Sequence, residues 1–187
     1  NFIKIKNISK KYEKNKTIKV LNDVSFNFVS GKIYSIVGPS GSGKSTLLNL
    51  LSLIDTPTSG TIEINNNKIN FENKIENDDI RAKNIGIIYQ DKNLLSDFTA
   101  IENVYFPNLL LSNDKKSSID IAKKIIKNVG LSARLNHFPS ELSGGESQRI
   151  AIARALINNP DIVLADEPTG SLDFENAKQI FKLLLNL

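Results

Sequence analysis

The sequence predicts an α/β fold with a mostly parallel sheet, an antiparallel β part near the N-terminus and a helical insertion. Apolar and alternating segments typical of strands occur before residue 90 and again after residue 158. One of them, Lys32 to Val37, precedes a glycine-rich turn and a helix-like segment, as in a βα unit of a parallel sheet. From about residue 91 to residue 157 the strand patterns stop and helical spacing replaces them.

The antiparallel part is predicted from three segments, Phe2 to Ile8, Val24 to Phe28 and Thr61 to Ile64. Each alternates apolar and polar residues, which is the period of a strand with one exposed face. We assign residues 1–35 and 60–70 to this part.

The core is predicted from three buried strands, Lys32 to Val37, Asn84 to Tyr89 and Asp161 to Asp166, which are apolar and rich in β-branched residues. Residues 32–90 and 158–187 are therefore assigned to a core with a parallel sheet.

The helical part, residues 91–157, contains Ala100 to Val104 and Ile119 to Gly130, where apolar residues recur at helical spacing and the second segment stops at a glycine. The polar stretch from Ile64 to Asp79 is interpreted as a surface loop.

Composition narrows the function classes. The 187 residues carry a formal net charge of +4 and no cysteine, which excludes disulfides and thiolate metal sites. Much of the positive excess lies early, and we interpret it as a solvated face and expect no nucleic-acid partner. These residues are Lys4, Lys6, Lys10, Lys11, Lys14, Lys16 and Lys19.

No apolar run reaches the roughly 18 residues of a membrane span, so membrane contact would come only through partners.

A phosphate-binding loop is predicted at Gly38 to Ser45, because GPSGSGKS fits the pattern G-x-x-x-x-G-K-[ST] in full. The glycines let backbone amides turn toward phosphate oxygens, and the following helix directs its positive end at the same anion. Lys44 supplies charge at the β- and γ-phosphates, and the Ser45 hydroxyl can hold Mg²⁺. The predicted nucleotide-binding residues here are Gly38, Pro39, Ser40, Gly41, Ser42, Gly43, Lys44, Ser45 and Thr46.

Two carboxylates, Asp166 and Glu167, end the predicted strand Asp161 to Asp166. Ligands bind at this edge of parallel sheets. Asp166 suits Mg²⁺, directly or through a water, and Glu167 can polarise an attacking water as a general base. Without the phosphate loop, a charged strand-to-loop junction would be the preferred interpretation.

Ser143 and Glu146 have the spacing of a capping box at the start of a helix. Capping alone explains these two residues. The consecutive glycines Gly144 and Gly145 add a second interpretation, because glycine costs about 1 kcal/mol in a helix relative to alanine and leaves the backbone open to a ligand.

Five motifs in order carry a family resemblance. They are GPSGSGKST, Gln90 after a strand, LSGGESQR, IVLADEP and GSLD (Gly170 to Asp173). On these motifs the whole chain resembles an ATP-binding-cassette (ABC) ATPase. The resemblance implies a single domain, residues 1–187, with a P-loop NTPase core, ATP and Mg²⁺ as cofactors, a second ABC ATPase subunit in a head-to-tail dimer, and transmembrane permease subunits.

The resemblance also implies roles for individual residues. Tyr12 would stack on adenine, with an ordinary strand-end aromatic as the alternative, and Gln90 would contact Mg²⁺ and the attacking water. Ser143, Gly144 and Gly145 would bind the γ-phosphate held by the partner, and Ser171 to Asp173 would lie across the dimer seam. The implied catalytic residues are Glu167, Lys44 and Gln90, and the implied metal residues are Ser45, Gln90 and Asp166.

The family's switch histidine follows the last helix, and the chain ends at Leu187 before reaching it. The single histidine, His137, is interpreted as a surface loop residue. We therefore expect a C-terminally incomplete domain that binds ATP weakly or moderately and turns it over poorly.

Three segments, Asp55 to Ile62, Asn93 to Pro107 and Leu164 to Asp173, resemble the lipoprotein-releasing subgroup. This resemblance implies an ATPase on the cytoplasmic face of the bacterial inner membrane that powers lipoprotein release. The alternatives are a macrolide-efflux or cell-division ABC complex and, further away, a soluble non-transport ABC ATPase.

Overall fold

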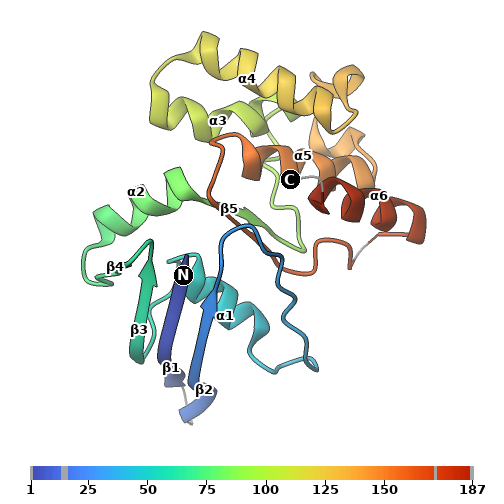
Figure 1. The fold of residues 1–187 in the computed structure, drawn as a ribbon. Helices are drawn as coiled ribbons and strands as arrows, with labels where there is room; N and C mark the ends of the chain where they lie inside the picture. Colours follow the sequence, from blue (N-terminus) through green and yellow to red (C-terminus); the bar gives the residue numbers. More distant parts are fainter. Residues whose placement is uncertain (1, 14–16, 171, 186–187) are drawn as a thin grey trace. The chain divides into compact units, whose positions relative to one another are not determined.

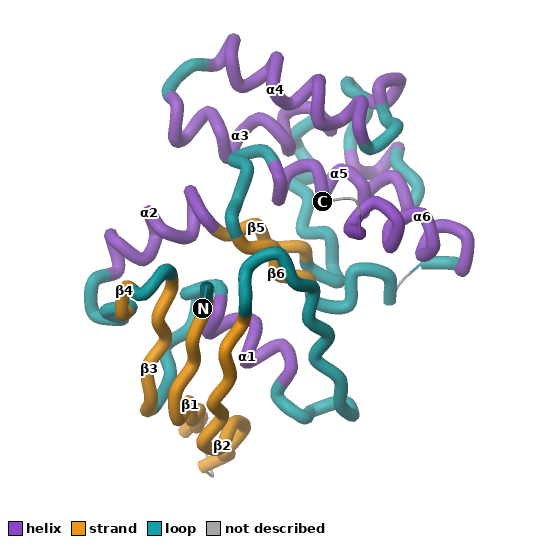
Figure 2. Tube along the Cα trace, in the orientation of Figure 1, coloured by secondary structure: helices purple, strands orange, loops and turns teal. Residues whose placement is uncertain are grey.

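The computed structural model describes residues 2–13, 17–170 and 172–185, which form two compact units, Asn1–Asp79 and Ile80–Leu187 (Figure 1). The boundary between the units falls inside a helix. Each unit has its own sheet (Figure 2). The strands of the first sheet are antiparallel, and those of the second are parallel.

The first unit is built on an antiparallel sheet in the order β2-β1-β3-β4. Its elements are β1 (Ile3–Glu13), β2 (Thr17–Phe28), α1 (Lys44–Leu51), β3 (Ser59–Ile64), β4 (Asn67–Lys68) and the start of α2 (Lys74–Asn84). Ile5, Ile8 and Ile62 alternate inward and are almost completely buried, together with Leu50 and Leu51 of α1. The predicted antiparallel part is confirmed.

The predicted core strand from Lys32 to Val37 is wrong for the described structure. These residues lie outside both sheets, and Ile33 and Val37 are 74% and 85% exposed. A β-branched sequence favours an extended backbone, but a strand also requires a neighbour that satisfies its amides and carbonyls. Among the described residues no strand pairs with this segment.

The predicted surface loop from Ile64 to Asp79 is also partly wrong, because it contains β4 and the first part of α2. Helix α2 begins with reciprocal bonds between two side chains and one amide. The Asn73 side-chain oxygen Oδ1 accepts from the Glu76 backbone amide at 3.3 Å, and the Glu76 carboxylate accepts from the Asn73 side-chain amide at 2.8 Å. This cap starts a helix that has no apolar periodicity to reveal it.

The second unit contains a parallel pair of strands and a layer of helices. Its elements are β5 (Ile85–Ile88), α3 (Ala100–Ser112), α4 (Lys115–Asn128), the short 3₁₀ turns η1 (Ser132–Arg134) and η2 (Pro139–Glu141), α5 (Gly144–Leu156), β6 (Ile162–Ala165) and α6 (Phe174–Leu185). Strands β5 and β6 pair in parallel register from Ile85↔Ile162 to Ile88↔Ala165. The predicted helical insertion and the parallel pairing of these two strands are confirmed.

Helix α5 is the centre of the second unit. Its Ile150 and Ala153 are fully buried with Val104 of α3 and Ile126 of α4. Its Ile152 is fully buried in a second cluster that includes residues of β5 and α6. The helix therefore has apolar contacts on more than one face. In Figure 1 it lies below α3 and α4.

The end of α5 lies directly against Gly86 of β5. A Cβ atom at residue 86 would stand 2.4 Å from the Ala155 carbonyl oxygen and 3.0 Å from a ring carbon of Pro160. Because that carbonyl belongs to a helix backbone, it cannot move aside as a flexible side chain could. Residue 86 must therefore be glycine for the helix to approach the strand this closely.

The start of α5 is held by a capping box and an ion pair. The Ser143 hydroxyl accepts from the Glu146 amide at 3.2 Å, and the Glu146 carboxylate accepts from the Ser143 amide at 2.8 Å. The Arg134 guanidinium donates to the other Glu146 oxygen at 2.9 Å. The bonds from Arg134 and from the Ser143 backbone lower the pKa of the Glu146 carboxyl to about 2.

Gly86→Ala is expected to destabilise the protein by about 1–3 kcal/mol, because the added methyl group overlaps the backbone of α5. Urea unfolding followed by circular dichroism measures the effect. Gly144→Ala is the matched control, since a Cβ there meets its nearest atom, in Leu172, at 3.9 Å. Equal unfolding midpoints for the two variants would contradict the close approach.

Glu146→Gln is expected to make stability less sensitive to acid. The folded pKa of Glu146, about 2, lies below the ordinary value of about 4.3, so the carboxylate stabilises the fold above pH ~4.3. This contribution disappears as the pH falls from about 4.3 to about 2. Urea midpoints measured across that range should fall more steeply for the wild type, and parallel curves would show that the ion pair contributes nothing.

Candidate functional site

The predicted phosphate loop of the first unit contains two glycines with positive φ and leads into the start of α1. Gly41 and Gly43 have φ values of +78° and +93°, a region that L-residues with side chains rarely adopt. Gly43 is the N-cap of α1 and provides no side-chain cap for the first-turn amides. Those amides, at the positive end of the helix, are consequently available to a phosphate group.

Lys44 lies over the same loop. Its ammonium donates to the carbonyl oxygens of Gly38 and Pro39 at 2.9 and 3.1 Å, and the Ser42 amide closes a turn by donating to the Pro39 carbonyl at 3.2 Å. A Cβ at Gly38 would stand 2.7 Å from the Ser42 hydroxyl, so the loop is narrow. Backbone amides, a lysine and hydroxyls around one loop are a donor set that fits nucleotide phosphates.

Tyr12 lies close to the phosphate loop within the first unit. Its hydroxyl donates to the Asp55 carboxylate at 2.8 Å and also interacts with the Thr46 side chain in the first turn of α1. Burial and the bond to Asp55 raise the pKa of the Tyr12 phenol. The structure thus brings Tyr12 and Thr46 together, although 34 positions separate them in the sequence.

Lys10 departs from the solvated face predicted for the early lysines. It is 9% exposed, whereas Lys6 and Lys11 of the same strand are exposed, and Lys14 and Lys16 lie outside the described residues. Its ammonium bonds to Asp55, which also accepts from Tyr12. The sequence pattern does not predict the burial of Lys10, because a lysine's charge does not indicate that a distant residue such as Asp55 pairs with it.

The end of β6 carries the predicted carboxylates of the second unit. The Asp166 amide donates to the Ile88 carbonyl at 2.9 Å and extends the parallel ladder. Glu167 follows with a φ of +44°, in the left-handed region that is uncommon for a residue with a side chain. Such backbone strain gathers at functional sites.

Gln90 and Glu167 converge on Gly170. A Cβ there would stand 3.2 Å from a Glu167 carboxylate oxygen and 3.4 Å from the Gln90 side-chain nitrogen. The second unit therefore brings together two predicted catalytic residues that follow different strands. In the sequence Gly170 belongs to the GSLD motif, but only the structure places it close to both side chains.

The predicted anion site at the start of α5 has one open glycine and one packed glycine. Gly144 is exposed, as a ligand-facing position requires. Gly145 is buried, and a Cβ there would stand 2.5 Å from the Asn176 side-chain oxygen. Close packing against α6 therefore accounts for Gly145, in addition to the predicted approach of a ligand.

Asn176 connects this helix start to the GSLD segment. Its side chain accepts from Arg149 at 3.4 Å and donates to the Asp173 carboxylate at 2.6 Å. The bonds from Asn176 lower the pKa of Asp173. Ser171 lies outside the described residues.

The predicted magnesium residues are divided between the units, with Ser45 in the first and Gln90 and Asp166 in the second. Among the described residues, no group of three or more His, Asp or Glu side chains could hold a metal ion. A hydroxyl, an amide and a carboxylate nonetheless match the oxygen donors that Mg²⁺ takes together with phosphates and water.

His137 lies in a loop, half-buried, with a ring nitrogen 3.4 Å from a guanidinium nitrogen of Arg134.

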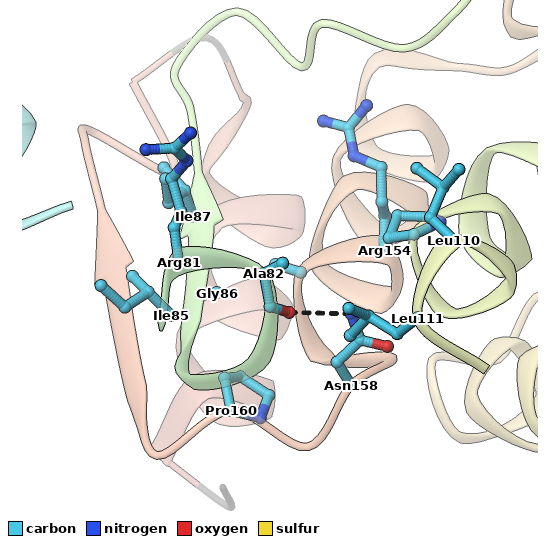
Figure 3. A pocket seen from close by; sticks show the side chains of 12 residues that line it. Arg81, Ala82, Ile85, Gly86, Ile87, Leu110, Leu111, Arg154, Asn158 and Pro160 are labelled. Atoms are coloured by element: carbon cyan, nitrogen blue, oxygen red, sulfur yellow. Dashed lines mark hydrogen bonds between the residues drawn. The ribbon is translucent and has the colours of Figure 1, made fainter. Parts of the chain in front are cut away.

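A groove of about 240 Å³ lies in the second unit between the end of α2, β5, α3 and α5 (Figure 3). Most of its lining is apolar, and Leu110 is 70% exposed. Arg154, which also lines it, donates to the backbone carbonyls of Lys92 and Asn93 at 2.7 and 2.6 Å. One side chain thus joins the groove to the segment after Gln90.

No helix within the described ranges combines the length and apolar character needed to cross a membrane.

The chain matches the family described as ABC transporter over residues 21–170. Two curated relatives bear the name lipoprotein-releasing system ATP-binding protein LolD. The one from Rickettsia bellii (strain RML369-C) is 47% identical over 98% of this chain and 81% of its own length. The one from Wigglesworthia glossinidia brevipalpis is 49% identical over 97% of this chain and 80% of its own length.

Solved structures support the same assignment. A dimeric, post-hydrolysis state of the ATP-binding cassette MJ0796 bound to ADP and Pi has a TM-score of 0.90 and 41% identity, covering 98% of this chain and 81% of that chain. A second dimeric structure of MJ0796, titled a bacterial ABC transporter cassette, also has a TM-score of 0.90, with 42% identity. From the matched family and these relatives, the chain belongs to the ABC transporter family and is an ATP-hydrolysing nucleotide-binding subunit.

Proposed function

We propose that this ATPase powers the release of lipoproteins, as a peripheral subunit on the cytoplasmic face of the bacterial inner membrane. The observation that carries the proposal is the similarity to the LolD proteins, which extends over 98% of the chain at 47% identity. The absence of a spanning helix from the described residues is compatible with membrane contact through a permease.

In the first unit, the chemistry belongs to the phosphate loop. Amides at the start of α1 and the Lys44 ammonium bind the nucleotide phosphates, and Lys44 exchanges its bonds to Gly38 and Pro39 for bonds to phosphate oxygens. When bound, Mg²⁺ would supply positive charge to the phosphate oxygens, and Ser45 is the residue of this unit that would hold it. Tyr12 stacks on adenine.

In the second unit, Glu167 and Gln90 serve the attacking water. Their convergence on Gly170 supports a joint role, in which the Glu167 carboxylate accepts a hydrogen bond from the water and Gln90 helps to orient it. Attack at the γ-phosphate breaks its bond to the β-phosphate oxygen and releases ADP and phosphate. Lys44 stabilises the charge on the transferred group.

A second copy of the subunit completes each site. The Ser143 hydroxyl and the open backbone at Gly144 lie at the positive end of α5, where they bind the γ-phosphate held by the partner. Asn176 joins this helix start to Asp173, so the two segments proposed to face the partner are held together.

The groove beside Arg154 is the proposed contact for the permease. Exposed Leu110 and the neighbouring Leu111 offer apolar surface to a partner helix, and Arg154 holds the segment that follows Gln90. A partner that moves Arg154 would consequently move this segment. This arrangement gives a physical route between nucleotide turnover and the membrane subunits.

Macrolide efflux and cell division are the alternative roles for the same ATPase. Purification of the protein from its own membranes with associated subunits, followed by mass spectrometry, distinguishes them. We expect permease subunits of a lipoprotein-releasing complex. Recovery of a macrolide-efflux or cell-division permease would replace the proposed cargo, and association with ribosomes alone would contradict transport.

Ser143→Arg is expected to leave ATP binding by the monomer within about twofold of wild type and to abolish ATP-dependent dimerisation. The large cation would occupy the place of the partner's phosphate, and no residue of the phosphate loop is changed. Light scattering measures dimerisation, and equilibrium dialysis measures binding. Equal loss of both would mean that the start of α5 only supports the fold.

Glu167→Gln is expected to bind ATP, to lower hydrolysis at least 100-fold and to accumulate an ATP-bound dimer, because the general base is lost while the phosphate loop is intact. Asp120→Asn, which changes an exposed carboxylate of α4, is the control and should hydrolyse ATP at the wild-type rate. Hydrolysis by Glu167→Gln at the wild-type rate would exclude Glu167 as the base.

A further inference from the structure

Lys10 of β1 is a buried lysine in the unit that contains the phosphate loop. It is 9% exposed, and its ammonium donates to an Asp55 carboxylate oxygen at 2.6 Å and to the Thr56 carbonyl at 2.7 Å. The same ammonium lies 4.8 Å from the centroid of the Tyr12 ring. A lysine has three N–H donors, so two are bonded and the charge also faces the aromatic ring.

Asp55 fixes the other end of Tyr12. One carboxylate oxygen accepts from Lys10 and the other accepts from the Tyr12 hydroxyl at 2.8 Å. Burial opposes ionisation of Asp55, but the bonds from Lys10 and Tyr12 outweigh it and lower the pKa of the carboxyl. The carboxylate therefore holds the ammonium and the phenol at the same time.

The loop that carries Asp55 is itself fastened to β1. The Thr58 amide donates to the Ser9 carbonyl at 2.9 Å, and the Thr58 hydroxyl accepts from the Lys11 amide at 2.9 Å. Irregular pairing of β1 with β2 occurs on both sides of Lys10. Such irregularities can redirect side chains. Lys10 and Tyr12 nevertheless keep the two-residue spacing that places side chains on one face of a strand, and their side chains lie together.

This arrangement leaves one side of the Tyr12 ring for another partner. The buried ammonium lies over one face of the ring, and Tyr12 is nevertheless 37% exposed. The Tyr12 hydroxyl also interacts with Thr46, so the ring lies near the phosphate loop of the same unit.

We propose that Lys10 and Asp55 are positioning residues that hold the Tyr12 ring for stacking with the nucleotide base, Lys10 from behind the ring and Asp55 through the hydroxyl. The inference rests on the proposed role of Tyr12 and adds the residues that orient it. The competing explanation is that Lys10 and Asp55 only fasten the loop after α1 to the sheet.

Lys10→Met tests the inference, because methionine keeps the length of the buried stem and removes the charge. We expect the affinity for ATP to fall about tenfold, while the affinity for inorganic tripolyphosphate, which has no base, stays unchanged. Lys6→Met is the matched control, since Lys6 forms a more exposed ion pair with Glu63 on the same sheet, at 3.7 Å. It should change neither affinity.

A double-mutant cycle distinguishes positioning from stability. In a Tyr12→Ala background, Lys10→Met should have no further effect on ATP affinity, because its action passes through the ring. Equal losses for ATP and tripolyphosphate, or an undiminished effect of Lys10→Met without Tyr12, would overturn the inference.

Two further measurements separate a failure of this inference from a folding defect and from a failure of the proposed function. If Lys10→Met does not fold, Tyr12→Phe replaces it, because this variant keeps the ring but loses the bond to Asp55. It should lower the affinity for ATP and leave the affinity for tripolyphosphate unchanged. An unchanged affinity for ATP would overturn the inference. Failure of the wild type to bind ATP would instead overturn the proposed function, and this inference with it.

Discussion

The burial of helix α5 is the interaction on which the second unit depends. Ile150 and Ala153 pack into the helical layer, and Ile152 packs with residues of β5 and α6. Each fully buried isoleucine contributes roughly 1.5–3 kcal/mol. Any shift of the helix that improved the packing of one cluster would disturb the packing of the other. The positions of both helix ends are therefore fixed by packing.

Both ends of α5 carry consequences for function. At the start, the capping box places Ser143 and an open glycine at the positive end of the helix. Near the end, Arg154 holds the backbone of Lys92 and Asn93, two and three residues after Gln90. The same rigid element therefore connects the proposed partner-nucleotide contact, the segment after Gln90 and the groove proposed for the permease.

Several features could be predicted from the sequence because their causes are local. The phosphate loop depends on glycines that reach positive φ and on a lysine at a set spacing, and Gly41, Gly43 and Lys44 have the expected geometry. Strands β1 and β3 follow from the alternation of apolar and polar residues, and β5 and β6 follow from apolar segments rich in β-branched residues. The segment 32–37 was mispredicted because composition favours an extended backbone without supplying a neighbour, and α2 was missed because its start depends on Asn73 and Glu76 instead of an apolar stripe.

The sequence by itself determined the family, the order of the motifs and the residue types available for phosphate, magnesium and water, since these depend on short spacings along the chain. Only the tertiary structure decided that Gln90 and Glu167 meet at Gly170, that Gly145 makes room for Asn176, and that Lys10 lies buried against Asp55. The physical reason is that these contacts join residues distant in sequence, and their geometry depends on packing that no local pattern encodes.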